Sequence, residues 1–288
     1  MPDTDAPDLT CTVASLHLHP LKSCGGLPVS EALLVETGLD LDRAWMVVDP
    51  DGEMLTQREL PRLALVMPTL RHADLVLRAP GMLALHLRLD TVEEPTRVRV
   101  WDDIVKAYDM GPLAAQWFSD YLGQPARLAR FDPEEKRLAD PKWSAGQAAE
   151  AAFADGFPLL VASTASLADL NARLAARGAA PVTMERFRPN IVIDGLQAFD
   201  EDNIGDLVID TPEGPVHLRL TKPCVRCGIP NNDPATAEVG TEPGATLAGF
   251  RADARMDGGI TFGMNAVVLE GFDRTLRVGQ VARARWAF

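Results

Sequence analysis

The sequence predicts an α+β protein that is mainly β, with a β-barrel-like N-terminal domain followed by a second β-barrel domain that carries a few helices. Short segments of alternating apolar and polar residues are spread along the 288-residue chain, as expected for half-buried strands. The regular alternation of strands and helices that a doubly wound sheet requires is absent. No glycine-rich phosphate-binding fingerprint occurs either.

The first third of the chain is predicted to be almost free of helix after a disordered lead at residues 1–9. Residues 12–19 alternate apolar and polar side chains up to a proline, which is typical of a strand followed by a loop. Two strands at 44–49 and 53–56 flank a hairpin turn with the sequence Pro50-Asp51-Gly52. Further strands are expected at residues 63–69, 75–77, 83–89 and 97–100.

The rest of the chain is predicted to contain two helices among further strands. Residues 112–122 carry aromatic side chains at helical spacing, which we expect in the core, and residues 166–177 carry leucines at that spacing; each segment is followed by a glycine. A charged connector is expected at 132–142. We expect a first domain over residues 10–125 and a second over residues 126–288. The strands of the second are expected at 190–193, 207–209, 216–221, 266–269 and 280–284.

The chain is acidic, with 41 aspartates and glutamates against 28 lysines and arginines and a formal net charge of −13. Binding to nucleic acid or to an anionic membrane surface requires a basic field, so neither partner is expected. No apolar run reaches the ~18 residues that span a bilayer, and residues 1–10 lack the composition of a signal or transit peptide. The four cysteines fit a reduced, cytoplasmic protein better than a disulfide-bonded one.

The cysteine pair Cys224 and Cys227 follows an apolar alternation that predicts a strand leading into a proline-rich loop. A structural zinc site needs four ligands, and the sequence offers no second ligand pair. A thioredoxin-like dithiol would open a helix, which the prolines after Cys227 exclude. The third interpretation is a single thiolate that binds a soft metal or acts as a nucleophile, since Lys222 and Arg226 flank the thiols and cations favour the anion. For Cys224, burial as a small apolar residue is an open alternative.

Two further loops carry residues suited to an anion. Residues 20–26 combine Lys22 and Ser23 with two glycines, a composition that can wrap an anion but is more common in simple turns. Arg43 and Arg58 bracket the predicted hairpin, so two arginines come from adjacent strands. Both could instead be solvated surface charges.

Several short motifs occur along the chain in a fixed order. Each motif is a weak indication of a protein family, but their ordered occurrence together is a strong one. They are His19 to Gly26, Asp42 to Trp45, Leu55 to Arg58, Pro61 to Leu63, Arg186 to Asn190, Lys222 to Cys227 with Asp233-Pro234, and Phe262-Gly263 with Asn265. Their ordered occurrence resembles the MOSC family, named after the C-terminal domain of the molybdenum cofactor sulfurase, with its usual N-terminal β-barrel domain. Within this family the chain is most similar to the mitochondrial amidoxime-reducing component and to bacterial proteins of the YcbX type.

The resemblance implies a molybdenum-pyranopterin cofactor (Mo-molybdopterin) rather than pyridoxal phosphate. It implies Cys227 as the thiolate ligand of molybdenum, Cys224 as a neighbour without a ligating role, and Asp155 as a carboxylate beside the metal, so that Cys227 and Asp155 are the catalytic residues. The positions that contact the cofactor in relatives correspond to Lys22, Ser23, Arg43, Arg188, Asn190 and Arg226. Because the cofactor ends in a phosphate, we also expect the other cations of these loops in its pocket, namely Arg58, Arg186 and Lys222.

The leading hypothesis for the function is a molybdenum-dependent oxidoreductase that reduces N-hydroxylated small molecules from N–OH to N–H. Because the chain ends just after the last predicted strand, a separate protein with a flavin or an iron–sulfur centre would donate the electrons. The alternative is a sulfur-carrier or cofactor-handling protein that uses Cys227 as a persulfide or cofactor ligand. A β-rich binding module with a structural cysteine pair is the third hypothesis. Lys22, Arg43, Arg188 and Cys227 are expected to converge on one pocket.

Overall fold

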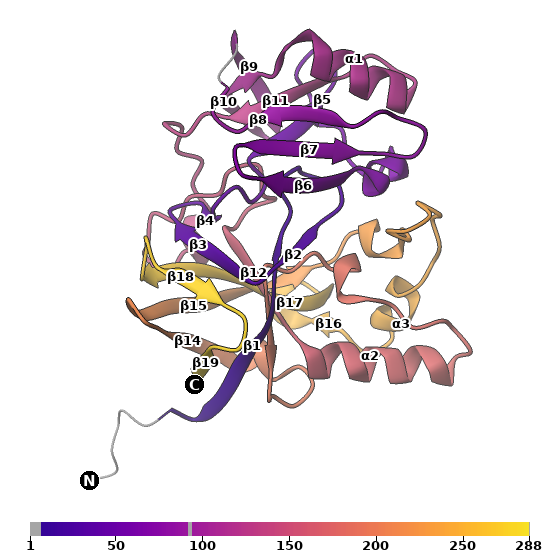
Figure 1. Cartoon of the computed structure of the whole chain (residues 1–288). Helices are drawn as coiled ribbons and strands as arrows, with labels where there is room; N and C mark the ends of the chain where they lie inside the picture. The colour runs from indigo at the N-terminus through magenta and orange to yellow at the C-terminus, as the bar shows by residue number, and fades with distance from the viewer. Residues whose placement is uncertain (1–6, 92–93, 288) are drawn as a thin grey trace.

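The computed structural model describes residues 7–91 and 94–287, which form two β-rich halves stacked on each other (Figure 1). The upper half in the figure contains most of residues 45–131, and the lower half contains most of the remaining chain. Within the described residues, no helix is long and apolar enough to cross a membrane.

The lower half is built on a closed barrel. Its strands follow the order β12–β13–β1–β19–β14–β15–β17, and β17 pairs again with β12. Closure leaves no unpaired strand edge around the barrel. Short strands β2 (Leu27–Val29) and β16 (Ala252–Asp253) extend it beside β1 and β17. The barrel strands are β1 (Leu9–Leu18), β12 (Leu159–Ser163), β13 (Ile191–Asp194), β14 (Ile204–Thr211), β15 (Gly214–Val225), β17 (Gly259–Glu270) and β19 (Val281–Trp286).

Strand β1 lies in this barrel, although it opens the segment in which the sequence predicted the first domain. Thr12 pairs with Asp194 of β13, and Cys11 pairs with Ala282 of β19. The alternation in β1 indicates only that one face must be covered, so a local pattern cannot identify partner strands this distant in sequence. Of the predicted disordered lead, residues 1–6 lie outside the described residues, and Leu9 already belongs to β1.

The upper half consists of two sheets and one helix. The sheets have the strand orders β5–β11–β10–β9 and β6–β7–β8. Helix α1 (Gly111–Leu122) buries its aromatic residues as predicted and ends at Gly123, whose φ is 71°. The strands are β5 (Trp45–Val48), β6 (Met67–Arg71), β7 (Asp74–Arg78), β8 (Leu85–Arg88), β9 (Glu94–Val100), β10 (Asp103–Asp109) and β11 (Arg127–Phe131). A small sheet of β18 (Thr275–Arg277), β3 (Glu31–Val35) and β4 (Gly38–Leu39) lies below it (Figure 1).

The predicted fold class is confirmed, since β-strands dominate and the described residues contain three α-helices. The helices besides α1 are α2 (Thr164–Ala176) and α3 (Gly244–Ala248). Two predicted strands differ from the structure. The segment at 53–56 forms only isolated bridges, of Met54 with Val48 and of Glu53 with Arg99, and the strand at residues 63–69 is wrong in its first part. Residues 61–65 form the 3₁₀-helix η1 (Pro61–Leu65), because proline suits the first turn of a helix. The strands that were not predicted are β2, β3, β4, β10, β11, β12, β16 and β18.

Candidate functional site

A small pocket lined by charged side chains lies where the loop after β1 meets the ends of the barrel strands. It encloses about 110 Å³, and we call it the charged pocket. The expected convergence of Lys22, Arg43, Arg188 and Cys227 is confirmed, whereas their roles toward a ligand stay predictions. Of the predicted residues, those that line it are Lys22, Ser23, Arg43, Arg58, Asp155, Arg188, Asn190, Arg226 and Cys227.

The loop after β1 is anchored in the core of the upper half. Leu21 and Cys24 are fully buried there, and Gln57 Nε2 donates to the carbonyl of Ser23 at 2.7 Å. Burial raises the pKa of Cys24 to about 12, so this thiol is a neutral packing group. Anchors on both sides therefore fix Lys22 and Ser23 at the junction of the two halves.

Lys22 and Asp155 form an ion pair across this junction. Lys22 Nζ donates to Asp155 Oδ1 at 2.5 Å and to the carbonyl of Phe153 at 2.8 Å. Burial lowers the pKa of Lys22, although Asp155 opposes this shift. Burial alone would raise the pKa of Asp155, but Lys22 and two nearby arginines hold that pKa well below its usual range. Asp155, whose side chain is 65% exposed, is therefore an ionised carboxylate at neutral pH.

Arg137 holds the segment that carries Asp155. Its Nη1 donates to the carbonyl of Ala154 at 2.6 Å, and its Nη2 donates to the carbonyl of Asp155 at 3.1 Å. Its Nε donates to Asp103 at 2.7 Å, which ties the segment to β10. The sequence did not indicate this role, because Arg137 lies in a charged stretch that we interpreted as a connector.

Protein oxygens hold the guanidinium groups of Arg43 and Arg188. Arg43 donates to the carboxylate of Asp42 and, at 2.9 Å, to the carbonyl of Arg188. Arg188 donates to the carbonyl of Cys24 and, at 3.5 Å, to that of Leu21. Burial and the nearby Arg43 lower the pKa of Arg188 to about 10, so it stays charged at neutral pH. Both arginines have a left-handed backbone, with φ of 48° and 57°, and such strain is typical of functional sites.

Asn190 is buried behind the pocket and joins two barrel strands. Its Oδ1 accepts from the backbone N–H of Leu160 at 3.1 Å. Its Nδ2 donates to the carbonyl of His17 at 3.4 Å. Because both ends of the amide already bind backbone groups, the first role of Asn190 is to hold β12 and β1 together.

The two thiols of the cysteine pair have different surroundings. Cys224 is half-buried near the end of β15, and Cys227 is exposed just beyond it. Arg226 Nη1 donates to Cys224 Sγ at 2.9 Å, and Nη2 donates to the carbonyl of Phe187 at 3.0 Å. The buried Nε of Arg226 has no hydrogen-bond partner among the described residues. Cys224 thus helps to orient Arg226, while the thiol of Cys227 lines the pocket and is accessible.

Trp101 is a residue at this site that the sequence interpretation missed. It lies in the turn between β9 and β10 with a left-handed φ of 57° and is 39% exposed. Its ring centroid is 4.6 Å from the guanidinium carbon of Arg58 and 5.8 Å from Lys22 Nζ. A tryptophan in a turn between two strands was the available signal, since exposed aromatic residues often serve in binding.

Two predicted cofactor residues, Arg186 and Lys222, do not line the charged pocket. Arg186 donates to the carbonyl of Asn232 at 3.0 Å and to Asp233 at 2.9 Å, and so supports a neighbouring loop. Lys222 Nζ lies 5.7 Å from the ring centroid of Phe157. The pairing of β15 with β17 shifts register on both sides of Lys222, so simple alternation along β15 does not predict where this side chain points.

Among the described residues, no group of three or more histidine, cysteine, aspartate or glutamate side chains is arranged to hold a metal ion. The cysteine pair therefore lacks the additional protein ligands of a structural zinc site. A metal at Cys227 would have to bring its other ligands with it, as a metal held by an organic cofactor does.

The donor set fits an anionic group that carries a soft metal. Five cations line the charged pocket, against one carboxylate, that of Asp155. Arginine forks match phosphate oxygens, and a thiolate is a ligand for soft metals. Because the enclosed volume equals that of about four water molecules, the pocket would enclose one end of a large cofactor. Fold and site together define a two-part β-barrel protein with a cationic, thiol-bearing pocket at its junction.

The comparison with known proteins agrees with this class. The models of the MOSC N-terminal beta barrel domain and of the MOSC domain match residues 10–125 and 148–283. The chain is 38% identical over 252 residues to mitochondrial amidoxime reducing component 2 of Rattus norvegicus, covering 83% of this chain and 72% of that protein. It is 37% identical over 256 residues to mitochondrial amidoxime-reducing component 1 of Homo sapiens, with the same coverage.

A more distant relative is the molybdenum cofactor sulfurase of Homo sapiens, which is 31% identical over 232 residues, or 75% of this chain and 26% of that protein. The chain belongs to the MOSC-domain family that includes the mitochondrial amidoxime reducing components. The resemblance predicted from the ordered motifs is thereby confirmed.

Proposed function

We propose that this protein is a molybdenum-cofactor-dependent reductase that converts the N–OH group of small molecules to N–H. The observation that carries the proposal is the accessible thiol of Cys227 in a pocket lined by five cations. Two of its relatives are named amidoxime reducing components, and a third is named for the molybdenum cofactor. Overall, one N–OH group, two electrons and two protons yield N–H and water.

The cofactor in this proposal is the molybdenum-pyranopterin, and several residues of the charged pocket would hold it. Lys22, Arg43 and Arg188 lie together at the junction and suit its phosphate, since several fixed cations bind phosphate strongly. The thiolate of Cys227 would bind the metal, and the Nε–H of Arg226 offers a further donor. When bound, the cofactor supplies the two-electron chemistry of the reduction.

The residues around the thiol prepare the site for this chemistry. Asp155 is ionised at neutral pH because Lys22 and nearby arginines depress its pKa, so in the resting site it accepts hydrogen bonds and does not donate a proton. Arg58 and Trp101 at the edge of the site add a cation and an aromatic face. Electrons would come from a separate flavin or iron–sulfur protein, and a cytoplasmic location is part of the proposal.

The second candidate is a sulfur-carrier or cofactor-handling function at Cys227. The exposure of this thiol favours it, since a persulfide must be presented to an acceptor. Similarity to a molybdenum cofactor sulfurase agrees with this alternative.

Metal analysis and pterin fluorescence test the proposal on protein from a molybdate-replete host, together with turnover of an amidoxime by an artificial reductant. We expect about one molybdenum and one pterin per chain. Cys227→Ala should lose at least about 100-fold in turnover, more than loss of an outer-shell partner costs. Cys224→Ser is the matched control, because serine keeps an acceptor for Arg226.

The outcome separates the two candidates. Full molybdenum-dependent turnover in Cys227→Ala would refute the ligand role of this thiol. Folded wild-type protein that holds neither molybdenum nor pterin, with Cys227 readily alkylated, would favour the sulfur-carrier function instead.

A further inference from the structure

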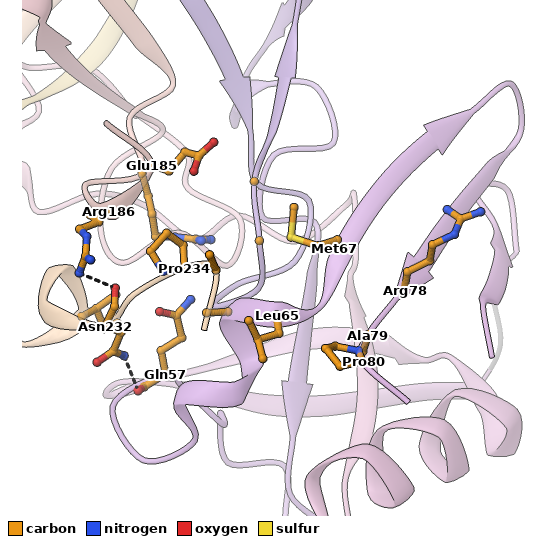
Figure 2. A pocket seen from close by; sticks show the side chains of 16 residues that line it. Gln57, Leu65, Met67, Arg78, Ala79, Pro80, Glu185, Arg186, Asn232 and Pro234 are labelled. Carbon is orange, nitrogen blue, oxygen red and sulfur yellow. Dashed lines mark hydrogen bonds between the residues drawn. The ribbon is translucent and has the colours of Figure 1, made fainter. Parts of the chain in front are cut away.

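A second, larger pocket lies beside the charged pocket, between the same two halves (Figure 2). It encloses about 470 Å³, and we call it the apolar pocket. Leu65, Met67 and Pro80 of the upper half form one wall, and Ile229, Pro234 and Ala235 of the loop after Cys227 form the other. A volume of 300–1,000 Å³ with mostly apolar walls is typical of small-molecule sites.

Hydrogen bonds between the halves hold the floor of the apolar pocket. Asn232 Nδ2 donates to the carbonyl of Gln57 at 3.0 Å, and Gln57 Nε2 donates to the carbonyl of Ser23 at 2.7 Å. Arg186 Nη1 donates to the carbonyl of Asn232 at 3.0 Å (Figure 2). The pocket is therefore formed before any ligand enters, which reduces the ordering cost of binding. This also explains where Arg186 acts, since it supports this wall rather than the charged pocket.

The two pockets adjoin each other. Arg188 and Ile229 line both of them, and Ile229 follows Cys227 by two positions along the chain. A ligand that fills the apolar pocket and reaches past Ile229 would therefore bring one end to the charged pocket, which Cys227 lines.

The charges around the apolar pocket favour a neutral ligand. Arg186 and Arg188 already donate to protein oxygens. Glu185 and Arg78 lie at opposite sides of the pocket (Figure 2), so one carboxylate and one guanidinium offset each other at the edge. The half-exposed Met67 adds an adaptable apolar surface.

We propose that the apolar pocket binds the hydrocarbon body of the N-hydroxylated substrate, with its N–OH end directed to the charged pocket. This rests on the proposed function and adds the substrate class: neutral amidoximes or related N–OH compounds that carry an aryl or alkyl body. Since a 150 Å³ apolar cavity holds benzene, a pocket about three times as large holds about two to three rings.

Filling the pocket from its outer wall tests this proposal. Ala235→Phe places a ring into the apolar pocket, whereas Val239→Phe enlarges an exposed apolar residue of the same loop that does not line it. The ligands are a two-ring aryl amidoxime and hydroxylamine, which has an N–OH group and no body. Calorimetry on the purified protein measures binding of the aryl amidoxime, and turnover with an artificial reductant gives KM for both compounds.

We expect Ala235→Phe to raise the Kd and the KM of the aryl amidoxime at least about 10-fold and to leave hydroxylamine within about 2-fold, since only the body would clash. Val239→Phe should match wild type for both. Met67→Phe fills the pocket from the opposite wall and should repeat the selective loss, which guards against a folding defect specific to Ala235→Phe.

Three outcomes would overturn the proposal. They are wild-type protein that binds no aryl amidoxime at millimolar concentration, Ala235→Phe and Val239→Phe that act alike, and binding that is lost when the cofactor is loaded because the cofactor competes for the apolar pocket. Selective binding by a protein that holds no molybdenum and reduces neither compound supports the apolar pocket while the proposed function fails.

Discussion

The charged pocket and the apolar pocket lie at the same junction and share two residues, but they are built by different means. In the charged pocket the lining side chains are themselves held by hydrogen bonds, as Lys22 donates to the Asp155 side chain and Arg43 donates to the backbone carbonyl of Arg188. In the apolar pocket, hydrogen bonds lie behind the walls, and the surface offered to a ligand is mainly small or flexible apolar groups.

This difference determines what each pocket tolerates. Removing one partner of a buried charged pair leaves the other uncompensated, which costs about 3–5 kcal/mol when both are fully buried. Changing an apolar wall alters buried area, at about 25 cal/mol per Å². The apolar pocket can therefore vary with the substrate, whereas changes in the charged pocket should affect every substrate.

The largest effect should come from Arg188→Lys, because Arg188 lines both pockets. Lysine cannot donate to the carbonyls of Cys24 and Leu21 together and also present a planar fork to a phosphate. We expect the cofactor to dissociate about 10–100-fold faster, as for loss of an outer-shell partner, with all substrates affected. The amount of molybdenum that the protein retains during dialysis measures the rate of cofactor dissociation. Arg78→Lys is the control, because Arg78 is an exposed arginine that lines only the apolar pocket. An equal loss of molybdenum in Arg78→Lys would contradict the difference between the two pockets.

The next effect should be a pH effect from His19, a buried histidine close to two arginines of the charged pocket. Burial, with Arg188 and Arg43 nearby, holds the pKa of His19 well below its usual value. Below pH 6.5 the unfolded chain binds a proton that the folded protein excludes, so the free energy of unfolding falls as pH falls. The slope is at most about 1.4 kcal/mol per pH unit for one histidine. Burial lowers the pKa of His17 as well, so His17 also makes the free energy of unfolding fall as pH falls.

Urea unfolding at pH 7 and pH 5 measures this dependence. His19→Gln should flatten the slope, and Ala235→Phe in the apolar pocket should keep that of wild type. An equal slope in wild type and His19→Gln would show that His19 is not the group responsible.

Asp155→Asn should lower the free energy of unfolding by less than the pH effect of His19 does. It keeps the shape of the side chain but removes the charge that compensates the buried Lys22. Because Asp155 is 65% exposed, solvent screening reduces the loss to about 1 kcal/mol, or about 2–4 °C in Tm. The pKa of Asp155 is depressed in the folded protein, so its contribution is present above the unfolded pKa of about 4 and is lost in stronger acid.

Thermal unfolding at pH 7 checks this value. Asp90→Asn is the matched control, since Asp90 pairs with Arg88 and both side chains are more than half exposed. If the Tm drops equally in both variants, the burial of Lys22 does not increase the cost of removing its partner charge.

The same comparison explains what the sequence could predict. Lys22, Arg43, Arg188 and Cys227 were predictable because their residue types and order match the ordered motifs of the MOSC family. The apolar pocket was not, because alanine, proline and leucine are common and their meeting depends on how the two halves pack. Arg137 was missed for a similar reason, since a buried clamp and a solvated charge look alike in sequence.

The strands show the same limit. Alternation predicted β1 but not its place between β13 and β19, because pairing of distant segments leaves no local pattern. Lys222 lies on a correctly predicted strand, yet it does not line the charged pocket. The register of β15 shifts on both sides of it, so the alternation along the strand does not predict where its side chain lies.

The smallest effect should follow Trp101→Leu, which changes the edge of the charged pocket without removing a charge. Its ring lies 4.6 Å from the guanidinium carbon of Arg58, and an exposed contact of this kind contributes about 0.5–1 kcal/mol, or about 2–5-fold in cofactor affinity. Molybdenum retention during dialysis measures the change. Trp143→Leu is the control, because the lysine near Trp143, Lys222, does not line the charged pocket, whereas Arg58 and Lys22 near Trp101 do. If both variants retained molybdenum equally, Trp101 would contribute nothing to cofactor binding, and only the cations and the thiol of the charged pocket would hold the cofactor.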